Sequence, residues 1–220
     1  MTHTLPSDEK SISSARRSAL RLLFILTAGS TPLPDPDESG ATLIFRGEKR
    51  LHALDFWVRY PDYLADELLE CYKKNGDHTL LDEVCIILTE EEPDLRRIPM
   101  LRWRFGAYDN LDTALSHLSS RRLVRQRKHQ TGDKVQEYDF LLFPKAVELA
   151  SQISDEFPQL AWYVRRAERV VWLAGNRSGN ALKERQHQRF EYHATPMGQN
   201  IPPIKDKVWA MFRELTEAAA

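Results

Sequence analysis

The sequence predicts a mainly α-helical protein with one small β-hairpin, and three observations support that fold class. Apolar residues recur at helical spacing through most of the chain. Two strand-like runs are joined by turn residues between positions 131 and 134. Proline and glycine residues mark the ends of several helical segments. With 220 residues, of which 42% are hydrophobic, the chain can bury a substantial core.

The segment from Asp109 to Leu149 combines a helix, a charged β-hairpin and a closing helix in unbroken order. The apolar stripe of the first helix consists of Leu111, Ala114, Leu115 and Leu118. Residues suited to the two helix ends flank it, namely Asp109, Asn110, Asp112, Arg121 and Arg122. A strand-like run from Leu123, a turn and a returning strand follow, and Pro144 suits the first turn of the next helix. This order predicts a winged helix-turn-helix core with helical additions.

The remaining segments follow the same local signals. We expect helices over about residues 12–28, 48–59, 63–73, 80–88, 160–174 and 204–215, with a polar helix or ordered loop at 178–192. The proline-rich stretch 30–40 is predicted to be an exposed loop. The predicted domains are a flexible tail over 1–10, a winged-helix domain over 11–153 with an acidic helical insertion around 61–95, and a C-terminal helical extension over 154–220.

Packing faces are also predicted from periodicity. Leu54, Phe56 and Trp57 are expected in the core, with Asp55 bound to a backbone group or a basic partner. The apolar face of the closing helix is expected to contain Ala146, Val147, Leu149, Ala150 and Ile153. The helix after Pro158 is expected to bury Leu160, Val164, Ala167, Val171 and Ala174, and to end at Gly175.

Charges are segregated along the chain although the net charge is only −1. Acidic residues dominate from Asp62 to Asp94, and basic residues dominate from Arg96 to Lys134. This asymmetry can create a local positive field for phosphate binding. It is equally compatible with two solvated faces, or with acidic and basic blocks that neutralise each other after folding.

Two segments are candidates for nucleic-acid contact. The wing carries Arg125, Arg127, Lys128, His129 and Lys134, whose cations can reach phosphates. The helix before it can present Ser116, Ser119, Ser120 and Arg122 to the major groove. Winged helices also bind proteins, and the fold alone does not choose between the two uses.

The segment Arg102-Trp103-Arg104-Phe105 alternates cations with aromatic rings. Such alternation can hold phosphates while the rings stack on bases. It also describes an edge strand in which Trp103 and Phe105 are buried, and burial is the favoured interpretation.

A family resemblance rests on the leucine-rich first helix, the segment Arg50 to Asp62, and the unit from Ala114 to Val124. Together they resemble middle components of prokaryotic ABC three-component conflict systems, over about Ala19 to Ile153. The resemblance implies a small winged-helix adaptor that accompanies an SMC- or RecN-like ABC ATPase and a separate effector in defence against mobile DNA. The acidic stretch before Ile98 and the tail after Ser154 lie outside it.

Sequence motifs for catalysis and cofactor binding are not found, so we predict no catalytic, metal-binding or cofactor-binding residues. Pro61-Asp62 suggests a metal-dependent nuclease, but no Asp/Glu-x-Lys motif follows it. His187 and His193 are six apart, which does not suit two zinc ligands on one helical face, so both are expected at the surface. Cys71 and Cys85 are predicted to be free thiols in a reducing cytoplasm.

The expected setting is cytoplasmic, because the longest apolar run is far below the roughly 20 residues needed to span a bilayer. The expected partners are the ABC ATPase and the effector, with double-stranded DNA as a further partner and dimer formation left open. We expect the aromatic residues Trp162, Tyr163 and Trp172 to contact the ATPase, and core packing is the alternative role for them. A free-standing DNA-binding regulator is the alternative function.

Overall fold

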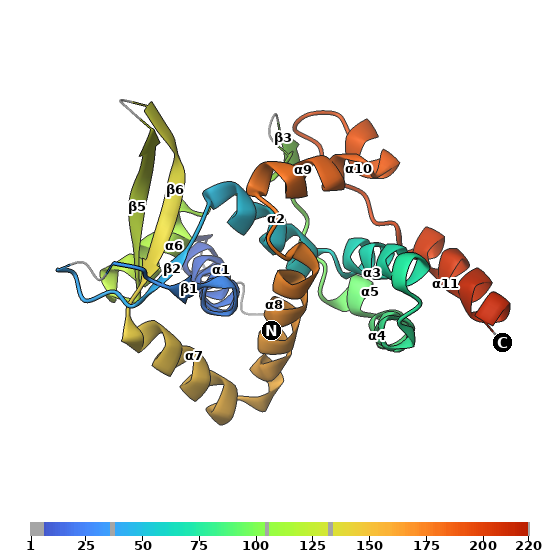
Figure 1. Cartoon of the computed structure of the whole chain (residues 1–220), viewed down its shortest axis with the longest axis horizontal. Helices are drawn as coiled ribbons and strands as arrows, with labels where there is room; N and C mark the ends of the chain where they lie inside the picture. The colour runs from blue at the N-terminus through green and yellow to red at the C-terminus, as the bar shows by residue number, and fades with distance from the viewer. Residues whose placement is uncertain (1–6, 36–37, 104–105, 132–133, 220) are drawn as a thin grey trace. The chain divides into compact units, whose positions relative to one another are not determined.

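The computed structural model describes residues 7–35, 38–103, 106–131 and 134–219, with the side chains of 7–13, 129–131, 134–136 and 219 left undescribed. The chain is mainly helical, with one four-stranded and one two-stranded antiparallel sheet in its described part (Figure 1). Its contacts form two compact units. Unit 1 comprises Met1–Leu51 and Asn110–Val171, and unit 2 comprises His52–Asp109 and Trp172–Ala220.

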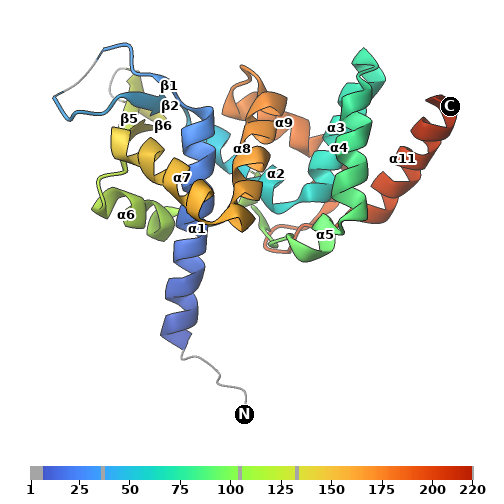
Figure 2. The ribbon, with the colours of Figure 1, turned by 90° about the horizontal axis from the view of Figure 1, so that it is seen from below.

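The helices of unit 1 pack around α1 (Ser7–Gly29). They are the first turn of α2 (Glu48–Arg59), α6 (Asp112–Ser120), α7 (Pro144–Glu156), the 3-10 helix η1 (Pro158–Leu160) and α8 (Ala161–Ala174) up to Val171. Helix α1 contacts α6 and α7 and buries Ala19, Leu22, Leu23, Phe24, Ile25 and Leu26. Its first turns extend beyond the other elements of unit 1 (Figure 2). The helix begins at Ser7, so the prediction of a loose tail is wrong for residues 7–10.

The four-stranded sheet of unit 1 has the order β1-β2-β6-β5. Its strands are β1 (Thr31–Pro32), β2 (Leu43–Phe45), β5 (Val124–Thr131) and β6 (Lys134–Leu142). Phe45 and Phe140 are paired in register and meet edge to face, while Ile44 and Leu141 lie in a small cluster with Leu33 and Ala41. Residues 30–40 were predicted to be a loop, but Thr31 and Pro32 form strand β1, whose backbone pairs with β2.

Two predicted helix faces differ from the observed ones. In α7 the small residues Ala146 and Ala150 are buried, whereas Val147 is 43% exposed. In α8 the buried apolar residues are Ala167, Val170, Leu173 and Ala174, so the stripe is rotated from the predicted one. Both differences arise because tertiary contacts select which of several adjacent apolar residues faces inward.

Unit 2 contains most of α2 and the helices α3 (Pro61–Asn75), α4 (His78–Thr89), α5 (Glu92–Leu95), α9 (Gly179–His187), α10 (Phe190–Ala194) and α11 (Lys205–Ala219). Its two strands are β3 (Leu101–Trp103) and β4 (Gly106–Tyr108). Pro61 starts α3, and Gly76 ends it in the left-handed conformation. Asp77 and Ser178 cap α4 and α9. The expected polar segment 178–192 thus forms helical structure.

Aromatic side chains make much of the core of unit 2. The ring of Phe56 lies 4.7 Å from Tyr60, 5.1 Å from Tyr63 and 5.3 Å from Tyr192. Trp57 is also buried, which confirms the core assignment of Leu54, Phe56 and Trp57. The Tyr60 hydroxyl accepts a 2.9 Å hydrogen bond from Met100 N and donates a 3.1 Å bond to Ile201 O. The core therefore joins α2 and α3 to residues near the C-terminus.

The two units divide the chain at places other than the predicted domain boundaries. The segment inserted into unit 1 runs from His52 to Asp109, and residues after Val171 pack with that insertion. In the described part of the chain, no helix is both long and apolar enough to cross a membrane.

Candidate nucleic-acid interface

Helix α6 is fixed in unit 1 by the apolar stripe that the sequence predicts. Leu111, Ala114, Leu115 and Leu118 are all buried. The Asn110 side chain accepts a 2.8 Å hydrogen bond from Asp112 N at the helix start. Asp109, which was also predicted there, instead forms a 2.7 Å ion pair with Arg59 in unit 2. The opposite face of α6 is exposed, and it contains Ser116, Ser119 and Ser120.

The junction between α6 and the hairpin requires an unusual backbone conformation at Arg122. Its φ is +54°, in the left-handed region that favours glycine. The N–H of Leu123 donates 3.0 Å to Leu118 O, and that of Arg122 donates 2.9 Å to Ser119 O. These bonds form a Schellman ending, which turns the chain directly from α6 into β5. The Arg122 side chain is exposed at this turn.

Strand β5 is the edge strand of its sheet, and its exposed residues include Arg125, Arg127 and Lys128. Figure 1 shows β5 and β6 extending beyond the helices of unit 1, with α6 near the base of the hairpin. Successive residues of a strand point to opposite faces, so Arg125 and Arg127 share one face while Lys128 points to the other. The side chains of His129 and Lys134 lie outside the described residues.

The acidic residues of β6 are held at the start of α2. Asp139 accepts a 3.1 Å hydrogen bond from Gly47 N, and Glu137 accepts a 3.4 Å bond from Lys49 N. Carboxylates are favourable there, because the first N–H groups of a helix lack intrahelical partners and carry partial positive charge. Asp139 also lies 3.8 Å from Arg127. Sequence analysis missed this role, although alternate positions in a strand place residues 137 and 139 on one face.

The acids of β6 and the cations of β5 differ in exposure, although Arg127 is also ion-paired with Asp139. Both carboxylates of β6 contact backbone groups before or within α2, whereas Arg125, Arg127 and Lys128 on β5 are exposed. The three hydroxyls of α6 and the exposed Arg122 lie on the element next to β5. This arrangement can bind phosphates with cations and approach base edges with small polar side chains. Charged residues on an edge strand can also serve to prevent sheet-to-sheet association.

The three aromatic residues predicted for partner binding are divided between the two units. Tyr163 stacks with Phe24 at 6.2 Å, and Trp162 packs edge-on against Tyr163 at 4.9 Å, both within unit 1. Trp172 belongs to unit 2 and is 49% exposed. Core packing thus accounts for Trp162 and Tyr163, and Trp172 is the residue of the three that presents a large exposed surface.

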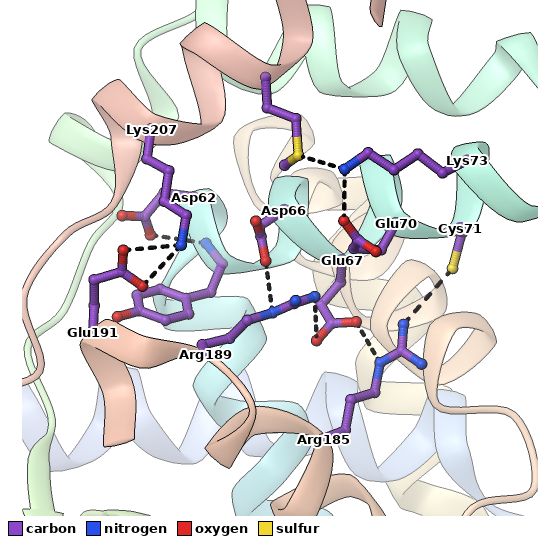
Figure 3. A network of polar contacts seen from close by, with 12 residues as sticks. Asp62, Asp66, Glu67, Glu70, Cys71, Lys73, Arg185, Arg189, Glu191 and Lys207 are labelled. Atoms are coloured by element: carbon purple, nitrogen blue, oxygen red, sulfur yellow. Dashed lines mark hydrogen bonds and ion pairs between the residues drawn. The ribbon is translucent and has the colours of Figure 1, made fainter. Parts of the chain in front are cut away.

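Two buried acids of the acidic block, Asp66 and Glu67, are paired within unit 2 with Arg185 and Arg189 (Figure 3). Glu67 of α3 is ion-paired with Arg185 and lies 3.1 Å from Arg189. Asp66 lies 2.6 Å from Nε of Arg189, although the two groups lack the alignment of a hydrogen bond. Both acids are almost fully buried, so their charges require such partners. These pairs identify Arg185 and Arg189 as structural partners that sequence analysis missed.

Burial affects the protonation of these acids. Desolvation raises the pKa of Asp66 to about 6, against the opposing effect of Arg189. Burial also raises the pKa of Asp62. The Asp62 carboxylate accepts hydrogen bonds from Tyr63 N at 3.0 Å and from Ile204 N at 2.6 Å. It therefore holds the segment that leads into α11, which accounts for its burial without a metal ion.

Trp103 is 47% exposed, so the prediction that it is buried is wrong. Residues 104 and 105 lie outside the described residues.

Cys71 and Cys85 are free, as predicted. His193 is exposed, whereas His187 is only partly exposed and its ring lies 5.1 Å from that of Tyr192. Within the described ranges, no group of three or more His, Cys, Asp or Glu side chains is arranged to hold a metal ion.

Comparisons with known proteins leave the family of this chain open. No protein-family model, no curated protein and no solved structure matches it.

Proposed function

We propose that this protein is a non-catalytic winged-helix adaptor. In this proposal α6 and the β5–β6 hairpin contact duplex DNA, and other surfaces link an SMC- or RecN-like ABC ATPase to an effector in a prokaryotic defence system. The observation that carries the DNA contact is the row of exposed cations on β5. Asp139 and Glu137 contact the start of α2, while Arg125, Arg127 and Lys128 are exposed on the adjacent strand.

The order and pairing of the elements of unit 1 support the winged-helix assignment. Helix α1 is followed by β2, the start of α2, α6 and the β5–β6 hairpin, and β2 pairs with the returning strand β6. A winged helix needs this order, with α6 as the recognition helix and the hairpin as the wing. The segment 52–109 of unit 2 then begins within the second helix, α2, and ends before the third, α6.

The DNA contact is tested by a salt series with a labelled duplex and the full-length protein. Replacing Arg125, Arg127 and Lys128 together with alanine should remove roughly three phosphate contacts. The slope of log affinity against log salt should become shallower by about 2 to 3 units. A charge-matched triple variant at exposed basic residues elsewhere in unit 1, Arg17, Lys145 and Arg165, should leave the slope nearly unchanged.

Two results would reject the DNA contact. One is an unchanged slope in the folded wing variant, and the other is the absence of duplex binding by the original protein at low salt. If the wing cations serve only to protect an edge strand, their removal should produce concentration-dependent association without any change in DNA affinity. Light scattering on the same samples separates that outcome from a loss of DNA contacts.

The adaptor role rests on the family resemblance, and it is tested by co-expression and purification with an SMC- or RecN-like ABC ATPase from the same genome. Stable co-purification supports the adaptor, whereas a dimer that binds a palindromic duplex without any partner supports a free-standing regulator. Truncation after residue 153 is unsuitable as a test, because residues 172–220 pack with residues 52–109 in unit 2. Trp172→Ala is the better variant. Its 49% exposure predicts weakened ATPase binding without unfolding if this ring is an interface residue.

A further inference from the structure

The β3–β4 hairpin of unit 2 presents an exposed apolar face. Leu101 pairs with Tyr108, and Trp103 pairs with Gly106, so these side chains share one side of the two-stranded sheet. Leu101 and Tyr108 are each 45% exposed, and Trp103 is 47% exposed. The Trp103 and Tyr108 positions are diagonal neighbours, which are separated by roughly 7 to 8 Å in an antiparallel pair.

Tyr192 supports the hairpin at the outer edge of β4 and through Arg102, whose side chain lies on the other face. The Tyr192 hydroxyl accepts a hydrogen bond from Ala107 N, and the Arg102 guanidinium lies 5.6 Å from the centre of its ring. Gly106 has a φ of +122°, and a Cβ at that position would lie 2.7 Å from the Tyr192 hydroxyl. Tyr192 is fully buried. The hairpin is therefore held on the core, which gives its exposed rings a fixed platform.

The backbone groups at the edges of the hairpin are already hydrogen-bonded, so a ligand can bind its exposed face more readily than its edges. On the outer side of β3, Arg102 N donates 2.8 Å to Gln199 O, and Gly198 N donates 2.8 Å to Arg102 O. On β4, the N–H of Ala107 is bound to Tyr192. An added peptide strand needs unpaired backbone groups at a sheet edge, and these groups are already engaged. A flat ligand that covers the rings is a better match.

Basic groups lie on the Tyr192 side of the hairpin. Burial lowers the pKa of His187 to about 4, and the charges of Arg102, Lys183 and His193 act in the same direction. Lys183 also lies beside Gly106, where a Cβ would meet its Cγ at 3.8 Å. Asp109, at the end of β4, is ion-paired with Arg59 at 2.7 Å. Basic groups next to exposed rings suit a ligand that combines phosphates with planar bases.

We propose that the β3–β4 hairpin binds single-stranded nucleic acid, with bases stacked on Trp103 and Tyr108 and the phosphate backbone near Lys183. Tyr108 already lies 5.8 Å from the His52 ring in a stacked arrangement, which orients it. Two aromatic residues on one sheet face can stack successive bases without a strict sequence preference. This surface belongs to unit 2, so the proposal is independent of the duplex contact assigned to α6 and the wing.

The experiment measures the anisotropy of a labelled oligothymidylate of about 20 nucleotides with the full-length protein at low salt. Trp103→Leu retains apolar surface but removes the ring, and it should weaken binding by about 5- to 150-fold. Trp103→Phe retains a ring and should bind more tightly than Trp103→Leu. Phe157→Leu, at a 45% exposed ring in unit 1, should match the original protein. Circular dichroism checks that each variant is folded.

Three results would overturn the proposal. They are no binding of the oligothymidylate by the original protein, unchanged binding by folded Trp103→Leu, and equal losses in Trp103→Leu and Phe157→Leu. Binding of an apolar peptide by both Trp103 variants, without any binding of the single strand, would instead assign the face to a protein partner. The triple alanine variant of Arg125, Arg127 and Lys128 should retain oligothymidylate affinity. Failure of the duplex proposal is thereby distinguished from failure of this one.

Discussion

The carboxylate of Asp139 accepts a 3.1 Å hydrogen bond from the backbone N–H of Gly47, which lies 92 residues earlier in the chain. This bond ties the returning strand of the hairpin to the first turn of α2, and both residues are buried. Gly47 suits the site because its φ is +90° and a Cβ would lie 2.8 Å from Glu137 Oε1. The conformation of the hairpin base thus depends on a contact between distant parts of the sequence.

Asp139→Ala should lower the free energy of unfolding by about 1 to 3 kcal/mol, because it leaves the buried Gly47 N–H without this charged acceptor. Asp139→Asn keeps an acceptor and should cost less. Urea denaturation followed by circular dichroism measures both values. Glu148→Ala, at an exposed position of α7, should change stability by no more than about 0.5 kcal/mol. Equal stability of Asp139→Ala and Glu148→Ala would contradict the structural role of Asp139.

Substitutions of Arg122 can distinguish its effect on folding stability from its effect on DNA binding. Arg122→Gly should raise the free energy of unfolding by about 0.5 to 1 kcal/mol, because glycine relieves the cost of the left-handed backbone. Arg122→Ala retains most of that cost and should bring no such gain. Both variants lose the guanidinium, so each should reduce the salt slope of duplex binding by about 0.9.

The comparison of the two Arg122 variants combines thermal unfolding with duplex anisotropy. Lower stability of Arg122→Gly than of Arg122→Ala would show that the positive φ is not a source of strain. Undiminished duplex affinity in both variants would remove Arg122 from the proposed interface.

Asp66 should make stability depend on pH between about 4 and 6. Its pKa rises from an ordinary value of about 3.9 in the unfolded chain to about 6 in the folded protein. Between these values the folded state holds a proton that the unfolded state has released. The free energy of unfolding therefore falls as pH rises through this window, by about 1 to 3 kcal/mol from this group.

Asp66→Asn isolates that contribution, because asparagine remains neutral while the other acids still titrate. The stability of the original protein relative to Asp66→Asn should decrease from pH 4 to pH 7, with most of the change complete near pH 6. Urea titrations at several pH values measure the difference. Asp82→Asn, an exposed position in α4, serves as the control and should run parallel to the original protein. A parallel curve for Asp66→Asn as well would refute the raised pKa.

Gly29 and Phe45 should be energetically coupled. A Cβ on Gly29 would lie 2.6 Å from Cε2 of Phe45, and the Phe45 ring is fully buried. Gly29→Ala should therefore destabilise the protein by about 1 to 3 kcal/mol despite the better helix propensity of alanine. In a Phe45→Leu background the same change should cost much less. A double-mutant cycle in urea measures the coupling, and simple additivity of the two changes would exclude the close contact.

Local sequence signals determined several elements of this protein. The helix over 48–59 and its end before Pro61 follow from apolar spacing and the conformational limits of proline, and the structure has the same bounds. The buried stripe of α6 follows from its period. The two hairpin strands follow from β propensity on either side of turn residues. Interactions within a few residues along the chain are sufficient to specify these features.

Tertiary contacts decided the features that matter for the candidate surfaces. The partners of the buried acids Asp66 and Glu67 lie more than 100 residues away, in Arg185 and Arg189. Trp103 is exposed because Arg102, on the opposite face of its hairpin, is the residue that packs on Tyr192. The wing acids Asp139 and Glu137 contact backbone groups at the start of α2, because α2 begins beside β6. Periodicity shows that a segment has two faces, but only long-range packing selects which face is buried and which charges remain exposed.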